Sequence, residues 1–400
     1  MNPLALYIHI PFCQSKCFYC DFYSTAVKKG DVPHAIYAKN LIQQLKNDVK
    51  RLGLENRPLL SVFFGGGTPS LMPPEFFEKV LNEISKVFVL DSRTEITVET
   101  NPKTATKKDF KKWRELGINR VSIGVQSFQD PLLKKLGRVH SAKEAKEALQ
   151  NCLSAGFENV SMDLIFGIPT QTFKNLGGDL ETAMSFQIPH ISAYQLTVES
   201  DTPLAGQVAR GEIETPPEEN LAKMISMVVR VFEDGGWHRY EISNFAKPGF
   251  ECRHNLQYWR YGDYLGLGEG AVSCVKKRRW RTMCDLSQGP ALPGREANSQ
   301  SLRSLKEDEE IIDDKTAWKE RWMMGLRLKE GVVLTKNESR LWGSSLAQWS
   351  KEGWVCRFSN PDRVALTSKG FLFCNQIVKA VFDLIDKEKK YDRCASHSSK

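Results

Sequence analysis

The sequence predicts an α/β fold: a partial barrel of six strand–helix units, followed by a mostly helical, winged-helix-like C-terminal domain. Two observations predict the barrel. Short apolar runs alternate with segments of helical periodicity between residues 4 and 233, and the sequence has no tight hairpin signals between them. Such alternation is typical of parallel strands joined by right-handed crossovers. Six units instead of eight indicate an open barrel.

The expected elements follow the chain in order. Strands are expected at 4–10, 59–64, 95–99, 120–124, 160–166 and 191–197, each followed by a helix, at 34–52, 74–88, 107–116, 141–155, 173–186 and 219–233. A further strand is expected at 240–246, and a polar linker at 287–304 that continues through the acidic run 306–310. The last unit has helices at 317–327, 335–342 and 344–352, a strand pair at 354–358 and 363–367, and a closing helix at 371–386.

These elements divide the chain into four parts. They are the barrel (1–236), a middle region with a basic stretch and a flexible linker (237–310), the C-terminal domain (311–386) and a polar tail (387–400). A winged helix often binds DNA, but the second helix of this one carries Gln348 and Lys351 and little arginine. Nucleic acid is therefore not an expected partner.

Three of the ten cysteines lie within eight residues, on the loop after the first strand. Pro11 ends this strand, so Cys13, Cys17 and Cys20 share one loop that can surround a single inorganic centre. Thiolates are the usual ligands of iron–sulfur clusters, and a cuboidal cluster held by three of them leaves one iron open. Two alternatives fit the same spacing: a zinc site with His9 as fourth ligand, and a dithiol redox pair of Cys17 and Cys20.

Polar residues and glycines stand where the other expected strands end. They are Gly65 to Thr68, Glu99, Gln126, Asp163 and Tyr194-Gln195. Ligands of such barrels bind at the C-terminal strand ends, and carboxylates buried there need partners. The glycines allow close backbone approach to a ligand. Alternatively, a triple glycine alone is more often a turn, and each polar residue can belong to a salt bridge or hydrogen bond within the barrel.

The C-x3-C-x2-C triplet after Tyr-x-His-x-Pro resembles the radical S-adenosylmethionine (SAM) superfamily, and within it the oxygen-independent coproporphyrinogen III oxidase family. The resemblance implies a 4Fe–4S cluster on Cys13, Cys17 and Cys20, with SAM chelating the fourth iron. It also implies an electron donor, such as a flavodoxin or ferredoxin. The SAM-binding residues it implies are Tyr7, Tyr19, Gly66, Gly67, Thr68, Glu99, Gln126, Arg138 and Asp163.

A second motif, His-Asn-x-x-Tyr-Trp from His254 to Trp259, resembles the haem-chaperone branch of this family. Imidazole is a common axial ligand of haem iron, and flat aromatic rings such as Tyr258 and Trp259 can pack on a porphyrin. The resemblance implies haem binding at His254. The motif itself is expected to lie well outside the barrel strands that bind the cluster and SAM. On chemistry alone, the alternative is that His254 is a hydrogen-bonded structural residue on a loop.

Two functions from different classes follow from this resemblance. One is a haem chaperone that passes haem to acceptor apoproteins, and the other is radical decarboxylation of coproporphyrinogen III. The chaperone is favoured because Phe22 stands where the enzyme type has a fourth cysteine, and because no N-terminal extension precedes the first strand. The His254 motif points the same way. A radical SAM enzyme with another substrate is the third possibility.

The composition limits the class of protein, the cellular compartment and the kinds of partner to be expected. With 41% hydrophobic and 26% charged residues, the chain is neither disordered nor fibrous, and its apolar runs are too short for a spanning helix. The N-terminus lacks a secretion signal and the cysteines lack a disulfide pattern, so the cytoplasm is expected. The net charge of +8 favours acidic partners, including porphyrin propionates and anionic lipid at a membrane surface. The basic run 276–281 is either a solvated face or a patch that meets acidic groups.

Overall fold

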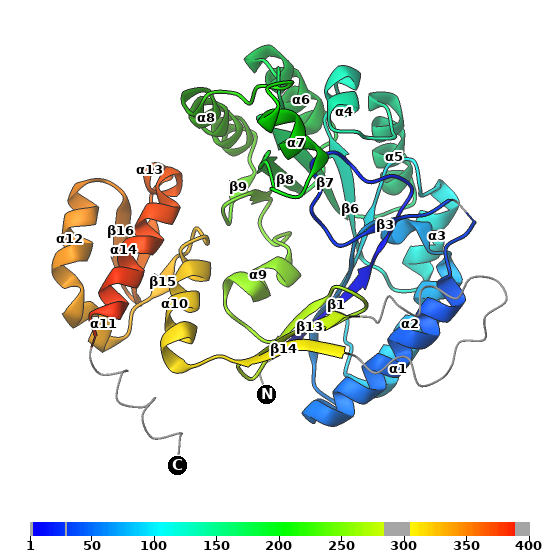
Figure 1. Ribbon diagram of the computed structural model, residues 1–400, viewed down its shortest axis with the longest axis horizontal. Helices are drawn as coiled ribbons and strands as arrows, with labels where there is room; N and C mark the ends of the chain where they lie inside the picture. Colours follow the sequence, from blue (N-terminus) through cyan, green and yellow to red (C-terminus); the bar gives the residue numbers. More distant parts are fainter. Residues whose placement is uncertain (1–2, 29, 284–304, 389–400) are drawn as a thin grey trace.

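The predicted partial barrel is confirmed. The structure, a computed structural model, describes residues 3–28, 30–283 and 305–388 (Figure 1). Its central strands lie side by side, each parallel to the next, in the order β1 (Leu4–Ile10), β4 (Leu59–Gly66), β5 (Glu95–Thr100), β6 (Arg120–Gln126), β7 (Asn159–Phe166) and β8 (His190–Gln195). These strands lie within two residues of the expected ranges, because runs such as Leu4 to Ile10 are buried almost throughout.

Helices cover the outer face of the barrel (Figure 1). They are α1 (His34–Leu52), α2 (Pro74–Val87), α3 (Lys107–Glu115), α5 (Ala142–Ser154), α6 (Phe173–Ser185) and α8 (Glu218–Asp234). Capping boxes on Thr106, Ser141 and Thr172 set the first residues of α3, α5 and α6. The short helices α4 (Asp130–Lys135) and α7 (Pro203–Ala209) were not predicted, although each has a proline in its first turn.

The sheet continues beyond the barrel strands on both sides. Next to β8 lie β10 (Asn244–Ala246) and β9 (His238–Arg239), and next to β1 lie β11 (Tyr264–Leu267), β12 (Val272–Val275), β13 (Arg278–Met283) and β14 (Leu305–Ile311). The predicted strand at 240–246 is too long, because the chain bends away before Asn244. The prediction of a linker is wrong for 306–310, which belong to β14; the rest of that linker, 287–304, lies outside the described residues.

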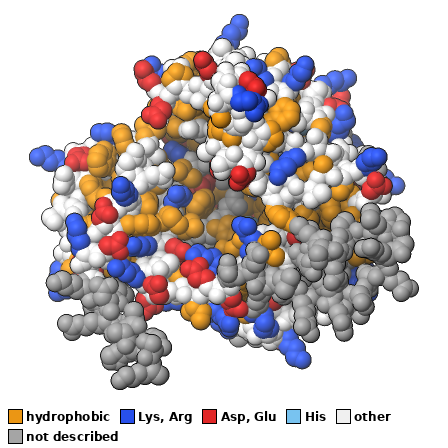
Figure 2. Space-filling model, in the orientation of Figure 1, with side chains coloured by type: hydrophobic (Ala, Val, Ile, Leu, Met, Phe, Trp, Pro, Cys, Tyr) orange, Lys and Arg blue, Asp and Glu red, His pale blue; other side chains and the backbone are white. Residues whose placement is uncertain are grey.

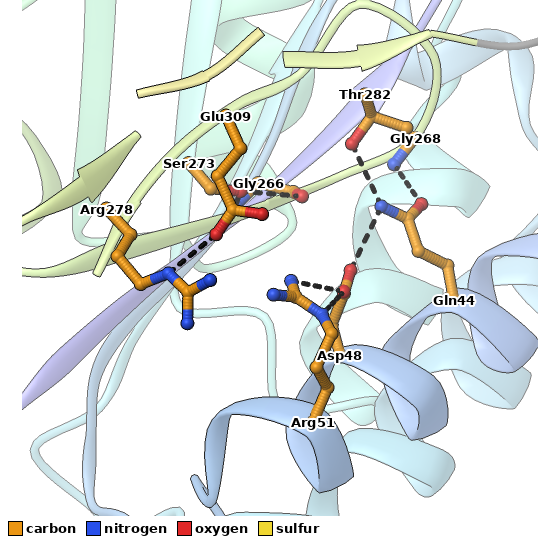
Figure 3. A network of polar contacts seen from close by, with 9 residues as sticks. All are labelled: Gln44, Asp48, Arg51, Gly266, Gly268, Ser273, Arg278, Thr282 and Glu309. Atoms are coloured by element: carbon orange, nitrogen blue, oxygen red, sulfur yellow. Dashed lines mark hydrogen bonds and ion pairs between the residues drawn. The ribbon is translucent and has the colours of Figure 1, made fainter. Parts of the chain in front are cut away.

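The basic run 276–281 meets acidic groups of the same chain. Arg278 of β13 pairs with Glu309 of β14 at 2.6 Å, and Arg279 pairs with Glu310 at 2.8 Å. Opposite charges on the two strands therefore stabilise the pairing of β13 with β14. Figure 3 shows the first of these pairs and the contact of α1 with this sheet. There Gln44 donates to Thr282 at 3.0 Å and accepts from the Gly268 amide at 2.9 Å.

The C-terminal unit has its own hydrophobic core. Its elements are α10 (Asp314–Gly325), β15 (Val332–Val333), α11 (Lys336–Leu341), α12 (Gly343–Lys351), β16 (Val355–Ser359), β17 (Asp362–Leu366), α13 (Ser368–Leu372) and α14 (Cys374–Asp386). This order matches the expected winged-helix-like arrangement, except that the expected closing helix 371–386 is divided into α13 and α14 and that β15 was not expected. The domain limits at 236 and 310 stay predictions. In the described part of the chain, no helix combines the length and apolar character needed to cross a membrane.

Candidate functional site

The cysteine loop lies at the C-terminal end of β1, as predicted. Its two ends are joined by β2 (Phe12–Cys13) and β3 (Thr25–Ala26), which pair with each other. Its middle is held at Phe18, whose amide donates to Leu136 O at 3.1 Å and whose carbonyl accepts from Leu204 N at 2.9 Å. The chain after β6 and the start of α7 therefore fix the loop over the open end of the barrel.

The three thiols of this loop are free and half-exposed. Thr68 Oγ1 lies 3.5 Å from Cys13 Sγ, and Arg138 Nη1 lies 3.4 Å from Cys17 Sγ, so both sulfurs face hydrogen-bond donors. Donors to the sulfurs stabilise thiolates and tune a cluster. Among the described residues, no three His, Cys, Asp or Glu side chains converge as ligands of one metal ion.

The glycine run packs against the cysteine loop. Gly66 has a φ of +111°, and a Cβ there would lie 2.6 Å from the His9 ring. A Cβ at Gly67 would lie 2.7 Å from Phe12 O and 3.0 Å from Cys13 Sγ. Only glycine fits at either position, and the Gly67 and Thr68 amides bond to the carbonyls of Ile10 and Phe12, each at 2.8 Å. The end of β4 and the thiols thus form one rigid unit.

Two predicted carboxylates lie at neighbouring strand ends inside the barrel. Glu99 accepts from the Gly66 amide at 3.2 Å, and Asp163 accepts from Ser122 at 3.2 Å. Burial and the nearby charge of Asp163 raise the pKa of Glu99 to about 8, and burial also raises the pKa of Asp163. Neither carboxylate forms an ion pair with a described residue. The pair is suited to a ligand that brings positive charge or hydrogen-bond donors.

The remaining predicted SAM residues surround the same opening. Arg138 donates to Gly124 O at 2.9 Å and, beside Cys17, also bonds to the half-buried Tyr19. Gln126 lies at an irregularity between β6 and β7 and has a φ of 66°. The hydroxyl of Tyr7, on β1, lies 3.0 Å from His9 Nδ1. The structure therefore brings all the predicted cluster and SAM residues to one end of the barrel.

We expect Glu99→Gln to make the cluster-free protein more stable in neutral and alkaline solution. Between the ordinary pKa of 4.5 and its folded pKa of about 8, folded Glu99 holds a proton that the unfolded chain releases, so stability falls as pH rises through this window. Melting temperatures at about pH 5 and about pH 8.5 test this, because the variant should gain over wild type only at the higher pH. Glu83→Gln serves as a control whose pKa shift has the opposite sign, because Lys46 and Lys86 lower the pKa of Glu83 to about 2. Equal gains at both pH values would contradict the expectation.

The prediction that the His254 motif lies well outside the barrel strands is wrong, because His254 packs against β4. It lies on α9 (Arg253–Trp259) and is buried, stacked on Phe63 of β4 with the ring centroids 4.7 Å apart. Nδ1 lies 2.8 Å from Ser61 Oγ, and Nε2 lies 2.8 Å from the Tyr258 hydroxyl. Burial lowers the pKa of His254 to about 3, so its imidazole is neutral. Both ring nitrogens are engaged in this conformation.

Tyr258 and Trp259 do not share one face with His254. The Tyr258 ring packs edge-on against His254 and Tyr264, at centroid distances of 5.0 and 4.6 Å. Trp259 instead contacts the Arg327 guanidinium, 5.9 Å from its ring, beside the C-terminal unit. Tyr258 therefore controls the surroundings of the imidazole, whereas Trp259 connects α9 to the next unit.

Sequence reasoning missed Glu95, which holds α9 in place. Its carboxylate accepts from Arg253 N at 3.1 Å and from His254 N at 3.2 Å, and so caps a helix whose own N-cap side chain, Cys252, forms no cap bond. The sequence did contain a signal for Glu95, because side chains alternate along a strand and every second one faces the same side. Glu95 and Glu99 are four residues apart on β5, so they face the same interior.

Comparison with known proteins identifies a matching family profile and several relatives of this chain. Residues 7–183 match the profile of the Radical SAM superfamily. The chain is 34% identical to the protein named heme chaperone HemW from Bacillus subtilis, over 94% of this chain and 98% of that protein. It is 42% identical to the heme chaperone HemW of Haemophilus influenzae, over 68% of this chain and 70% of that protein.

A solved structure shares the fold. The coproporphyrinogen III oxidase HemN from Escherichia coli, described as a radical SAM enzyme, matches with a TM-score of 0.76 and 20% identity, over 96% of this chain and 90% of that chain. At this level of identity, the match shows a common fold and leaves the activity to be argued from the site.

Proposed function

Because this chain belongs to the HemW family of radical SAM proteins, we propose that it is a haem chaperone, which binds haem and passes it to acceptor proteins. The observation that carries this proposal is the similarity to a heme chaperone over 94% of the chain, which includes the His254 motif and the C-terminal unit. The competing decarboxylase function is supported only by a shared fold. A radical SAM protein also carries a 4Fe–4S cluster and SAM.

We assign the cluster to Cys13, Cys17 and Cys20, and SAM to the strand ends around them. The cluster, when bound, would be the electron source for SAM cleavage. The protein's part is positioning, since Gly66 and Gly67 seat β4 against the loop and Arg138 holds Cys17 from the other side. Glu99 and Asp163 provide buried acceptors without an ion-pair partner, as a ligand with a cationic sulfonium requires.

Asp163→Ala should weaken SAM binding and leave the iron content near that of wild type. The carboxylate lies on β7, outside the cysteine loop, so its loss removes a buried charged hydrogen bond, worth about 1.5 to 3 kcal/mol, without removing a metal ligand. Equilibrium dialysis of SAM against reconstituted protein measures the effect. Asp179→Ala is a matched control, because this buried carboxylate bonds to Ser127 and the Phe128 amide. Unchanged SAM affinity in Asp163→Ala would move the site elsewhere.

We propose His254 as the axial ligand of haem iron, with Tyr258 and Trp259 as packing residues of the haem site. The neutral imidazole is the form that binds iron. In the described conformation, Nε2 is bonded to Tyr258, so ligation requires the separation of His254 from Tyr258. The proposed movement is a shift of α9, which is only seven residues long.

Further partners are part of the same proposal. We propose cytoplasmic localisation and an electron donor, such as a flavodoxin or ferredoxin, that meets the loop carrying the three cysteines. Peripheral contact with a membrane would bring haem to acceptors there, and the net charge of +8 suits an anionic lipid surface. Nucleic acid is not among the proposed partners.

Anaerobically reconstituted protein tests the proposed function directly. Haem titration should give stoichiometric binding, and the loaded protein should pass its haem to an apo haem protein. The same sample should not convert coproporphyrinogen III in the presence of SAM and a reductant. Decarboxylation without haem binding would reverse the assignment in favour of the enzyme.

A further inference from the structure

The interior of the barrel holds a buried cation without a direct partner. Arg120 is the first residue of β6 and is 2% exposed, and its guanidinium forms no hydrogen bond or ion pair with any residue that the structure describes. Its neighbour in the register of β5, Thr97, also has a buried hydroxyl without a partner. Buried charges are normally paired, because an unpaired one loses its hydration.

The polar groups around Arg120 are engaged elsewhere. The groups that interact electrostatically with Arg120 are, largest effect first, Cys252, Glu95, Tyr240 and Asp163. The Cys252 thiol donates to Glu95 at 3.5 Å. Glu95 caps α9, Asp163 accepts from Ser122, and the Tyr240 hydroxyl lies 2.9 Å from His190 Nε2. None of them lies within hydrogen-bond distance of the guanidinium. The donors of Arg120 are therefore available to a ligand in the barrel interior.

The barrel interior is close to both the haem motif and a hollow in the surface. Glu95 accepts from the His254 amide at 3.2 Å, and Thr97, two residues further along β5 and on the same face, is the register neighbour of Arg120, so Arg120 and His254 border the same interior. Figure 2 shows a hollow in the middle of this face, where Figure 1 places the space between β8, β9 and α9. Hydrophobic side chains border much of this hollow (Figure 2), as suits a flat apolar macrocycle.

We propose that Arg120 binds a propionate carboxylate of haem in the barrel interior, next to His254. The inference rests on the proposed haem-chaperone function. Haem is apolar except at its iron and its two propionates, and a guanidinium is the side chain best matched to a carboxylate, through two parallel N–H···O bonds. His254 and Arg120 would then hold the two chemically distinct parts of the same ligand.

The test compares two ligands that differ only at the carboxylates, namely haem and the dimethyl ester of iron protoporphyrin IX. We expect Arg120→Gln to weaken haem binding by about tenfold to a hundredfold and to leave the affinity for the ester within about twofold. Arg120→Lys should recover part of the loss, because it restores the charge without the planar fork. Arg57→Gln controls for loss of a buried arginine, since Arg57 is also buried and pairs with Asp263 at 2.8 Å.

Each outcome decides between binding and structural roles. If Arg120→Gln weakens haem and ester equally, Arg120 only supports the fold, and the proposal is wrong. Equal affinities of wild type for haem and ester would also overturn it. If wild type binds neither ligand, the haem-chaperone function itself fails, which is a distinct result. Circular dichroism and iron content confirm that Arg120→Gln is folded and carries its cluster.

Discussion

Replacement of Cys17 by alanine is expected to remove most of the iron and sulfide from anaerobically reconstituted protein. Three thiolates are the whole protein-derived ligand set of the proposed cluster, and two hold a cuboidal cluster poorly. Cys13→Ala and Cys20→Ala should have the same effect, because all three thiols belong to the one loop fixed between Leu136 and Leu204. Iron and sulfide analysis, with the visible absorption of the cluster, measures the loss.

The matched control for this prediction is Cys274→Ala. Cys274 is also half-exposed and free, but it lies on β12, away from the cysteine loop. This variant should keep its full iron and sulfide content. Loss of the cluster in Cys274→Ala, or its retention in Cys17→Ala, would show that the three loop thiols are not the ligands.

The barrel and the cluster loop could be predicted because their signals are local in sequence. A parallel strand buried on both faces is an apolar run, and each amphipathic helix shows its own periodicity. The end of each parallel strand lies at one edge of the sheet, so Glu99 and Asp163 could be placed together without coordinates. The glycine motif was predicted to approach a ligand, and the structure adds its contact with the cysteine loop.

The strands from β11 to β14 could not be predicted in the same way. On β13 and β14, arginines and glutamates pair across the sheet, so the segments look like charge runs rather than strands. The stabilising contacts connect residues about thirty positions apart, across 284–304, and no local period reveals them.

The position of α9 was unpredictable for a similar reason. The helix has seven residues and no side-chain cap of its own, and its N-terminus is held by Glu95, which is 158 residues away from Arg253 in the sequence. The sequence alone does not reveal this contact, so a role could be assigned to the motif only by resemblance. The structure shows that His254 packs inside the barrel, against Phe63 and close to Tyr7 of the proposed SAM site.

His254→Ala is expected to change or abolish the axial ligation of bound haem while leaving the iron and sulfide of the cluster in place. Its imidazole is the proposed iron ligand, and it lies on α9 rather than on the cysteine loop. Optical and electron paramagnetic resonance spectra of the haem-loaded proteins measure the change. Because removal of a buried ring also leaves a cavity beside Phe63, cluster content and circular dichroism must show that the variant is folded.

Tyr258→Phe separates ligation from packing at the same position. It keeps the ring that packs against His254 but removes the hydroxyl that lies 2.8 Å from Nε2. If His254 ligates the iron, freeing Nε2 should speed haem binding and preserve the wild-type spectrum of the loaded protein. If His254 is only a structural residue, Tyr258→Phe should leave the binding rate unchanged, and the spectra of His254→Ala and wild type should coincide. Such a result would move the haem ligand out of α9, since no other histidine lies on that helix.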